Sequence, residues 1–407
     1  MDARAPAAAG RWPLIGSTLL LGAFSGLMTP FLPAYYRSLG LSGQQMGFLL
    51  AIPPAFVVLA PPLWGHLADR TGRSDRVLRG MAVGVTAGLT AIWAAGRFPE
   101  VALAVAFYAF FYSGLLPVLD SIILRRVSAV GGAFSRFRLF VSLGFVVCSA
   151  LFGALMKAVD RRLMVAGMVV MSGLAAMSLT LGRGQAPCRA KRLSEGAVIF
   201  RHREMVILLI ACALHWMACA PFHATLSIYI LSLGLPTWVV GTTFSVSVLA
   251  EAALMLAYPR FARRFQPRHL LFAAFAVSAL RWLGIAQANR VVDFVGLAVL
   301  HAFTFGVFFV AATEALARRV PDRLRASAQG MMFSVVFGVG GTVGYAVAGT
   351  AYDAVGGPTL FGIAAGIEAV AAVLVLQMRP GQWRRPTVRT EPQAPSAERG
   401  AQRPLRP

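Results

Sequence analysis

The sequence predicts an all-α integral membrane protein with about twelve transmembrane helices in two six-helix repeats. Hydrophobic residues make up 57% of the 407-residue chain. Charged residues make up only 13%, about half of their usual share in soluble proteins. Apolar stretches of about 20 residues, enough to cross a bilayer as a helix, recur along most of the chain. Such spans must be helical, because lipid offers the backbone no hydrogen-bond partners.

The predicted spans follow one another through short polar connections, except in the middle and at the end of the chain. They lie near residues 12–36, 44–65, 77–96, 99–124, 137–158, 162–182, 204–232, 238–259, 269–288, 291–316, 327–350 and 357–378. The first span is too long for the apolar core of a secretion signal and lacks a small-residue cleavage motif, so we expect it to be retained. The predicted organisation is an N-terminal bundle (12–182), a cytoplasmic central loop (183–203), a C-terminal bundle (204–378) and a disordered cytoplasmic tail rich in Pro and Arg (379–407).

The positive charge of the chain, +22 at pH 7, is concentrated in the loops on one side of the predicted spans. Loops with an excess of Arg and Lys normally face the cytoplasm, so both termini are expected inside, in the inner membrane of a bacterium. Because these residues occupy short loops rather than one helix face, the charge does not indicate nucleic-acid binding. The four cysteines show no metal-ligand spacing. They are Cys148, Cys188, Cys212 and Cys219.

The two halves of the chain share a repeat at a constant offset. The segment Ser38–Leu41 recurs as Ser232–Leu235, and at the same offset Asp120 matches Glu314, each followed closely by Arg-Arg-Val. Transporters built from such repeats bind their substrate at the repeat interface, near the middle of the bilayer. The sequence therefore predicts a binding site between the two halves.

A short charged turn between the second and third predicted spans has a distinctive pattern. It contains Gly65, Asp69, Arg70, Gly72 and Arg73 in the arrangement G-x-L-A-D-R-x-G-R. The pattern resembles the cytoplasmic loop between helices 2 and 3 of the major facilitator superfamily of transporters. The resemblance implies a transporter in which this loop is a gating motif. Its small residues let helix ends approach, its aspartate caps a helix N-terminus, and its arginines pair with acids or lipid phosphates.

Ionisable residues within the spans are the main functional candidates, because a charge at the bilayer centre costs at least about 2.5 kcal/mol without a cavity or partner. They are Asp120, His215, His223, Glu251, Arg281, His301, Glu314 and Glu368. Glu251, Arg281 and His301 occupy the adjacent eighth, ninth and tenth spans. A carboxyl there must be protonated or paired, an arginine is a fixed counter-ion, and a histidine exchanges protons near neutral pH. We expect a proton-coupling group; three unrelated packing residues are the alternative.

The same residues sharpen the resemblance within the superfamily. The chain resembles the phenylpropionate-permease branch, close to the lactose-permease type of proton symporter. In that type an acid on helix 8, an arginine on helix 9 and a histidine on helix 10 couple proton movement, which is the placement of Glu251, Arg281 and His301. An acid late on helix 4 and an arginine early on helix 5 engage the substrate there. Asp120 and Arg138 match them in placement, and the alternative for Arg138 is one more positive residue on the cytoplasmic side.

One position departs from the lactose-permease pattern. That type carries a second acid one turn after its helix 10 histidine, where this chain has Thr304. Either Glu251 alone carries the proton, or Glu314 or Asp120 shares the task. A second role is equally open for Asp120, since an acid near the cytoplasmic end of a helix could lock the gate by pairing with a motif arginine such as Arg73. For Glu314 the gate role is favoured.

Aromatic side chains of the first and seventh spans are expected to line the substrate site. The predicted substrate contacts among them are Tyr35, Trp216 and His223. Rings with polar tips suit a sugar, a nucleoside or an aromatic acid. Glu368, in the last span, is expected at the periphery of the bundle, reaching the membrane surface or paired.

These features predict a secondary active transporter, with proton-coupled import of a small organic solute by alternating access. The sequence contains no phosphate-binding loop and no enzyme motif, so ATP use, catalysis, cofactors and metals are not expected. A proton-coupled exporter is the alternative, although the fifth span lacks the glycine-proline signature usual in such exporters. A membrane sensor that does not transport would leave the intramembrane ionisable group without a purpose. The expected partners are the solute, protons and lipid, without nucleic acid, and the protein is expected to be monomeric.

Overall fold

The fold is given by a computed structural model that describes residues 11–130, 134–181, 202–262, 264–321 and 324–379. Within these ranges the chain is helical and contains no β-strand. Eleven of the helices are long and apolar enough to cross a membrane. The predicted all-α membrane fold is therefore confirmed. The central loop (183–203) and the tail (379–407) lie almost entirely outside the described residues.

The first half of the chain forms six spans, of which the fourth and sixth are built from two elements each. The elements are α2 (Arg11–Ser38), α3 (Gly43–Thr71), α4 (Ser74–Ala94), α5 (Phe98–Tyr112) continued by α6 (Leu115–Val130), α7 (Phe134–Leu155), and α8 (Arg162–Ser178) continued by the 3₁₀ turn η1 (Leu179–Leu181). The break between α5 and α6 contains Gly114, where a Cβ would stand 2.5 Å from the Trp64 ring. Only glycine fits there, because the indole of α3 fills the space.

The second half has more interruptions. Its elements are α9 (Arg203–Ala224) continued by α10 (Leu226–Ser232), α11 (Thr237–Ala262), α12 (Pro267–Gln287), α13 (Val291–Ala298), the π-helix η3 (Ala302–Val307), α14 (Phe308–Ala317), α15 (Arg325–Phe333), the π-helix η5 (Ser334–Gly340) and α16 (Gly341–Leu376). The tenth span thus runs from α13 through η3 to α14. The eleventh runs from α15 through η5 into α16.

The last apolar stretch, Ser327–Leu376, is 50 residues long. A single helix of that length would measure about 75 Å, more than twice the roughly 30 Å of the hydrocarbon core. The stretch is divided inside α16 at Gly356, with φ 74° and ψ 170°, a conformation that glycine adopts readily. It therefore crosses the membrane twice, and the described residues contain the twelve spans predicted from the sequence.

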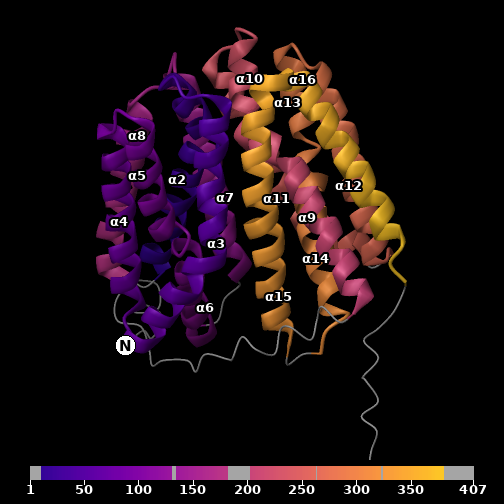
Figure 1. Cartoon of the computed structure of the whole chain (residues 1–407). Helices are drawn as coiled ribbons and strands as arrows, with labels where there is room; N and C mark the ends of the chain where they lie inside the picture. The colour runs from indigo at the N-terminus through magenta and orange to yellow at the C-terminus, as the bar shows by residue number, and fades with distance from the viewer. Residues whose placement is uncertain (1–10, 131–133, 182–201, 263, 322–323, 380–407) are drawn as a thin grey trace, which may run out of the picture.

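The two halves form bundles that meet along two helix pairs (Figure 1). In the first half α2 packs against α7 and α8, and α4 packs against α5 and α8. In the second half α16 packs against α9 and α12, and α11 packs against η3. Most contacts between the halves are those of α3 with α16 and η5, and of α7 with α11, and α2 adds smaller contacts with α9, α10 and α11. A site between the halves is therefore bordered mainly by α3, α7, α11 and the span that contains η5.

The contacts between the halves are closest at the end opposite the Arg-rich loops. A Cβ on Gly47 of α3 would stand 2.7 Å from a carbonyl oxygen of α16, so only glycine permits this approach. At the same end Arg37 and Asp353 form an ion pair that joins α2 to α16. At the Arg-rich end a Cβ on Gly65 would meet no atom within 4 Å. The halves are thus clamped together at the Arg-poor end.

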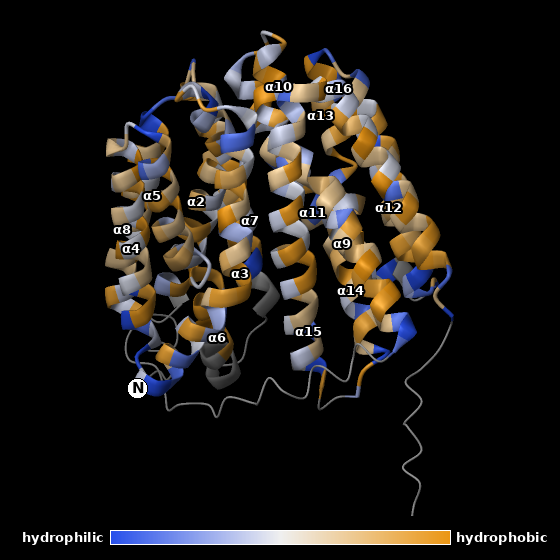
Figure 2. Cartoon of the chain, viewed as in Figure 1, coloured by the Kyte–Doolittle hydropathy of each residue, from blue (hydrophilic) through white to orange (hydrophobic). Residues whose placement is uncertain are grey.

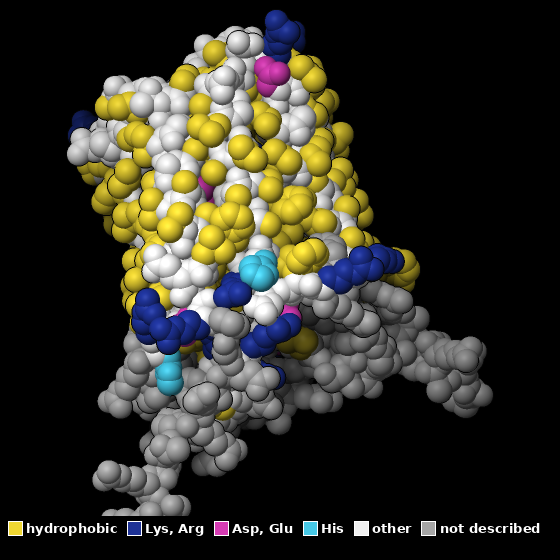
Figure 3. Space-filling view, turned by 90° about the vertical axis from the view of Figure 1, so that its right-hand side faces the viewer, with side chains coloured by type: hydrophobic (Ala, Val, Ile, Leu, Met, Phe, Trp, Pro, Cys, Tyr) yellow, Lys and Arg dark blue, Asp and Glu magenta, His cyan; other side chains and the backbone are white. Residues whose placement is uncertain are grey.

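The outer surface of the bundle is apolar along its middle and charged toward its ends (Figure 2). Large hydrophobic side chains remain exposed there, among them Leu59, Leu103, Leu151, Leu256 and Val373. Figure 3 shows Lys and Arg side chains gathered below a broad apolar surface. An exposed apolar surface of this extent requires lipid around it.

Candidate functional site

The first half contributes an acid–arginine pair. Asp120 lies on α6 and Arg138 near the start of α7, and Arg138 Nη1 donates to Asp120 Oδ2 at 3.0 Å. Their side chains are 24% and 45% exposed. Arg138 also interacts electrostatically with Glu251 on α11, across the contact between the halves. The ion pair of Asp120 is thus with Arg138 and not with the motif residue Arg73.

Glu251, Arg281 and His301, predicted as a group, come together in the second half. His301 Nε2 lies 3.7 Å from Glu251 Oε2, and His301 Nδ1 lies 3.0 Å from Arg281 Nη1. The side chain of Glu251 is 19% exposed and that of His301 is 8% exposed. Arg281 is completely buried. The histidine therefore stands between a partly accessible acid and a buried positive charge.

Arg281 is held by polar and aromatic groups. Its Nε donates to Leu297 O at 3.2 Å, and its guanidinium carbon lies 4.3 Å from the centre of the Phe222 ring. Among the described residues no carboxylate forms an ion pair with the guanidinium, and Nη2 has no hydrogen-bond partner. A buried charge without a counter-ion is unfavourable by several kcal/mol. Arg281 is thus a fixed positive charge that favours the ionised form of any acid nearby.

Hydrogen-bond directions determine where the proton of His301 lies. Arginine can only donate, so His301 Nδ1 accepts from Arg281. The proton of the neutral ring is therefore on Nε2, which points toward Glu251. A second proton on Nδ1 would require Arg281 to withdraw. In this arrangement His301 is a neutral bridge between Glu251 and Arg281.

The tenth span widens into a π-helix at this position. The π-helix η3 begins directly after His301. Such wider turns interrupt the regular backbone pairing and are frequent at functional sites. Here Thr304 O lies 2.8 Å from His215 Nε2. Gly306 brings η3 against α11, since a Cβ there would lie 3.4 Å from Glu251 O. The irregular span thus connects Glu251 to a second buried histidine.

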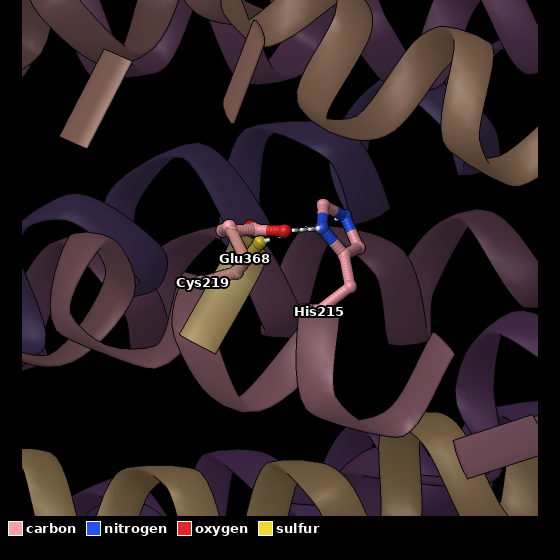
Figure 4. A group of neighbouring side chains, drawn as sticks. All are labelled: His215, Cys219 and Glu368. Carbon is pink, nitrogen blue, oxygen red and sulfur yellow. Dashed lines mark hydrogen bonds and ion pairs between the residues drawn. The ribbon is translucent and has the colours of Figure 1, made fainter. Parts of the chain in front are cut away.

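This second histidine belongs to an acid–histidine pair that the sequence did not predict as a site (Figure 4). Glu368 on α16 is completely buried, so its predicted place at the periphery is wrong. Its Oε2 lies 2.8 Å from His215 Nδ1, and its Oε1 accepts from Trp282 Nε1 at 3.1 Å. Cys219, one turn after His215, places its Sγ 3.7 Å from His215 Nε2. The sequence shows only that each of two distant spans contains an ionisable residue, and this does not predict that the two residues pair.

The predicted aromatic contacts differ in accessibility. Trp216 and His223 on α9 are partly exposed, with ring centres 5.6 Å apart. The ring of Trp216 packs edge-on against Phe337 of η5, at 4.6 Å between ring centres. Tyr35 on α2 is 1% exposed, and its hydroxyl has no hydrogen-bond partner. Trp216 and His223 are therefore open to a ligand as they stand, whereas Tyr35 requires a conformational change.

The predicted gating motif lies at the end of α3. Gly72 ends this helix in the left-handed conformation, with φ 62°. Glu314 on α14 forms an ion pair with Arg318 one turn later and accepts a hydrogen bond from Tyr258 Oη at 3.2 Å. Both of these partners belong to the same half as Glu314. The described ion pair of Glu314 therefore does not join the two halves.

The model of one protein family, the MFS_1 like family, matches residues 12–363 of the chain. The chain belongs to this family. It is a membrane transporter of the major facilitator type, as its similarity to permeases and transporters also shows. The predicted membership of the major facilitator superfamily is thereby confirmed.

Several relatives of this MFS_1-like transporter are similar over most of their length. A maltose permease of Geobacillus stearothermophilus is 28% identical over 322 residues, which cover 77% of this chain and 81% of the permease. The probable 3-phenylpropionic acid transporter of Escherichia coli (strain K12) is 25% identical over 316 residues, 76% of this chain and 82% of that protein. The solved structure of a mutant nucleoside transporter NupG covers 91% of this chain and 99% of its own, with a TM-score of 0.84 and 19% identity. The last similarity confirms the fold.

Proposed function

We propose that this transporter imports a small organic solute together with protons by alternating access. The observation that supports the proposal is the arrangement of Glu251, His301 and Arg281. A partly accessible carboxyl inside the membrane is neutral when it holds a proton and becomes an anion when it releases it. Because a fixed positive charge lies behind the histidine, the proton affinity of the acid depends on how closely the three groups approach. Such a dependence is what proton coupling requires.

In the proposed cycle Glu251 binds a proton while the site faces outward and releases it on the cytoplasmic side. The distance of 3.7 Å between Glu251 Oε2 and His301 Nε2 exceeds a normal N–H···O hydrogen bond by about 0.7 Å. A small movement of α11 toward η3 closes this gap. The ionised acid then accepts from His301 Nε2–H, and Arg281 stabilises the negative charge through His301 Nδ1. A movement apart favours the protonated acid.

The described conformation fits one end of such a cycle. We place the Arg-rich loops and both termini in the cytoplasm of a bacterial inner membrane, and treat residues 12–182 and 204–378 as the moving bundles. The contact at Gly47 and the Arg37–Asp353 ion pair then close the outer side. This state is inward-facing. In the outward-facing state the motif loop around Gly65 would pack against the second half, where Glu314 could exchange Arg318 for a motif arginine.

The substrate class proposed from the sequence is an aromatic acid, a sugar or a nucleoside. Asp120 and Arg138 offer an exposed acceptor and donor pair for hydroxyl, carboxylate or amide groups. Trp216 and His223 offer two neighbouring rings on which a sugar or an aromatic group can stack. The names of the relatives, a maltose permease, a probable 3-phenylpropionic acid transporter and a nucleoside transporter, are consistent with these three classes.

Proton movement with the substrate tests the proposal. De-energised cells that produce the protein are given maltose, 3-phenylpropionate or uridine in turn, and the pH of the medium is recorded against cells without the protein. Import with protons makes the medium more alkaline for at least one of these compounds. Acidification would indicate the alternative, a proton-coupled exporter. Uptake of a labelled compound without any pH change would contradict proton coupling.

A further inference from the structure

Two ionisable side chains inside the second half have no role in the function proposed above, His215 on α9 and Glu368 on α16 (Figure 4). Both side chains are completely buried, and His215 Nδ1 lies 2.8 Å from Glu368 Oε2. Both ends of the pair are anchored. His215 Nε2 lies 2.8 Å from Thr304 O, and Trp282 Nε1 donates to Glu368 Oε1 at 3.1 Å. Ionisable residues at such a depth in membrane spans are candidates for handling protons or ions.

The geometry requires that the pair holds a proton between its two members. A carbonyl oxygen only accepts, so His215 Nε2 carries a proton and donates to Thr304 O. Without a further proton, a lone pair on His215 Nδ1 would face an oxygen of the Glu368 carboxylate at 2.8 Å. The contact therefore contains one more proton, either on the histidine as an imidazolium beside a carboxylate or on the acid beside a neutral ring. Both forms have no net charge.

The two histidines of this region thus differ in what they can bind. His301 accepts from Arg281 at Nδ1 and cannot take a second proton while this contact lasts. His215 has no such contact, because both of its ring nitrogens face acceptors, Thr304 O and Glu368. His215 and Glu368 can therefore hold their shared proton while His301 stays neutral.

Arg281 connects the pair to Glu251. Among the described residues, the titratable or charged groups facing Glu368 from the helices packed against it are His215 and Cys219 on α9 and Arg281 on α12. Only Arg281 is a permanent charge. It interacts electrostatically with Glu368 without forming an ion pair, and its Nη2 has no hydrogen-bond partner. The guanidinium thus faces Glu368 directly and Glu251 only through His301, and Arg138 on α7 is the other charged group that faces Glu251.

We propose that His215 and Glu368 form a second proton-binding site, whose occupancy is coupled to that of Glu251 through Arg281. This inference rests on the proposed proton coupling at Glu251. When Glu251 is ionised, Arg281 compensates its charge and the pair keeps its proton. When Glu251 is protonated, Arg281 is free to stabilise a negative charge on Glu368. The proton then leaves the hydrogen bond between Nδ1 and Oε2 for water that enters as the spans move, and Glu368 keeps the negative charge. His215 Nδ1 and Glu368 Oε2 must move apart in this step, because their contact at 2.8 Å requires the proton.

The same side chains could be considered as metal ligands, since donor atoms of His215, Cys219 and Glu368 lie within 4.8 Å of one another. Two observations favour a proton over a metal ion. Both ring nitrogens of His215 are already engaged in hydrogen bonds, so a cation would have to displace Glu368 or Thr304 O from one of them. The guanidinium of Arg281 also opposes a divalent cation at this position, because within the described part of the chain it forms no ion pair with a carboxylate.

Proton binding by the purified full-length protein, without substrate, tests the inference. Acid–base titrations of the wild type and of Glu368→Gln are subtracted to give the titration of the pair. The glutamine preserves both hydrogen bonds, because its Nε2–H donates to His215 Nδ1 and its Oε1 accepts from Trp282, but it has no proton to release. The subtraction is repeated in the Glu251→Gln background and, as a matched control, in the Glu314→Gln background, which removes a different acid of the same half.

We expect the wild type to release one proton more than Glu368→Gln. This step should move to lower pH in the Glu251→Gln background, because Arg281 is no longer shared, and should stay unmoved in the Glu314→Gln background. Equal curves for the wild type and Glu368→Gln would make the pair purely structural and overturn the inference. A step that Glu251→Gln leaves unmoved would overturn the coupling, and bound zinc in the purified protein would assign the pair to a metal.

A second variant keeps the test decisive if Glu368→Gln does not fold. His215→Gln retains an amide donor for Thr304 O and removes the imidazole, so Glu368 alone must hold the proton. The titration step should therefore remain but move to another pH than in the wild type, and a step that stays at the wild-type pH would contradict the inference. Failure of the proposed function is separate, because it would appear as solute uptake without proton movement and not in these titrations.

Discussion

Replacing Glu251 by glutamine is the sharpest test of proton coupling. Glu251→Gln keeps the shape of the side chain and an oxygen that can accept from His301 Nε2–H, but it imitates the protonated acid permanently. Accumulation of substrate against a gradient should disappear. Exchange of labelled substrate across the membrane should continue, because exchange requires no release of a proton. The two activities therefore separate in a single variant.

The size of the effect follows from the number of acids involved. If Glu251 carries one proton for each substrate molecule, a difference of one pH unit is worth about 1.4 kcal/mol and sustains about tenfold accumulation. The variant should instead reach a ratio near one at any imposed pH difference. Glutamine has nearly the volume of glutamate, can accept a hydrogen bond from His301 Nε2–H, and carries no charge that the membrane interior would penalise. The variant is therefore expected to fold.

Proteoliposomes with a clamped membrane potential and an imposed pH difference provide the assay. Accumulation and exchange are measured with the compound that alkalinises the medium in cells. Glu100→Gln is the control, because Glu100 is an exposed acid whose carboxylate accepts backbone N–H groups at the start of α5. It should accumulate substrate like the wild type. If Glu251→Gln still accumulates substrate tenfold per pH unit, the proton does not travel on Glu251, and the reasoning is refuted.

Further outcomes concern the two ends of the bundle and its orientation. Gly47→Leu should prevent closure at the Arg-poor end and abolish transport, because its Cβ alone would stand 2.7 Å from a carbonyl oxygen of α16; Gly362→Leu, with no atom within 4 Å of its Cβ, should transport normally. Asp353→Asn should destabilise the closed Arg-poor end by about 1–2 kcal/mol, which raises the population of the open form five- to thirtyfold. The change is measurable as faster alkylation of a cysteine introduced at the Arg-poor end. Asp69→Asn should slow transport and leave equilibrium substrate binding nearly unchanged. If the variant transports at the normal rate, the motif loop has no role in gating. A reporter domain fused after Pro380 should be cytoplasmic, and a periplasmic signal would reverse the proposed orientation.

The sequence predicts the positions of some functional candidates but not of others. Glu251, Arg281 and His301 are isolated ionisable residues in consecutive spans, and consecutive spans normally lie close together, so their meeting follows from spacing and hydropathy. The pairing of His215 with Glu368 joins the seventh and twelfth spans, 153 positions apart. The last span is hydrophobic on all its faces, so its sequence does not show which face is directed inward. The predicted peripheral position of Glu368 was wrong for this reason.

The sequence by itself determined the class of the protein, the number of spans and the residues whose charge lipid does not tolerate. These properties depend on local hydrophobicity and on residue identity, which can both be read directly from the sequence. Only the tertiary structure decided the hydrogen-bond directions that make His301 a neutral bridge, the π-helix that presents Thr304 O to His215, and the end at which the halves are clamped. These depend on the rotation and depth of each helix relative to its neighbours. Packing of side chains from distant spans sets both quantities, and no single span contains that information.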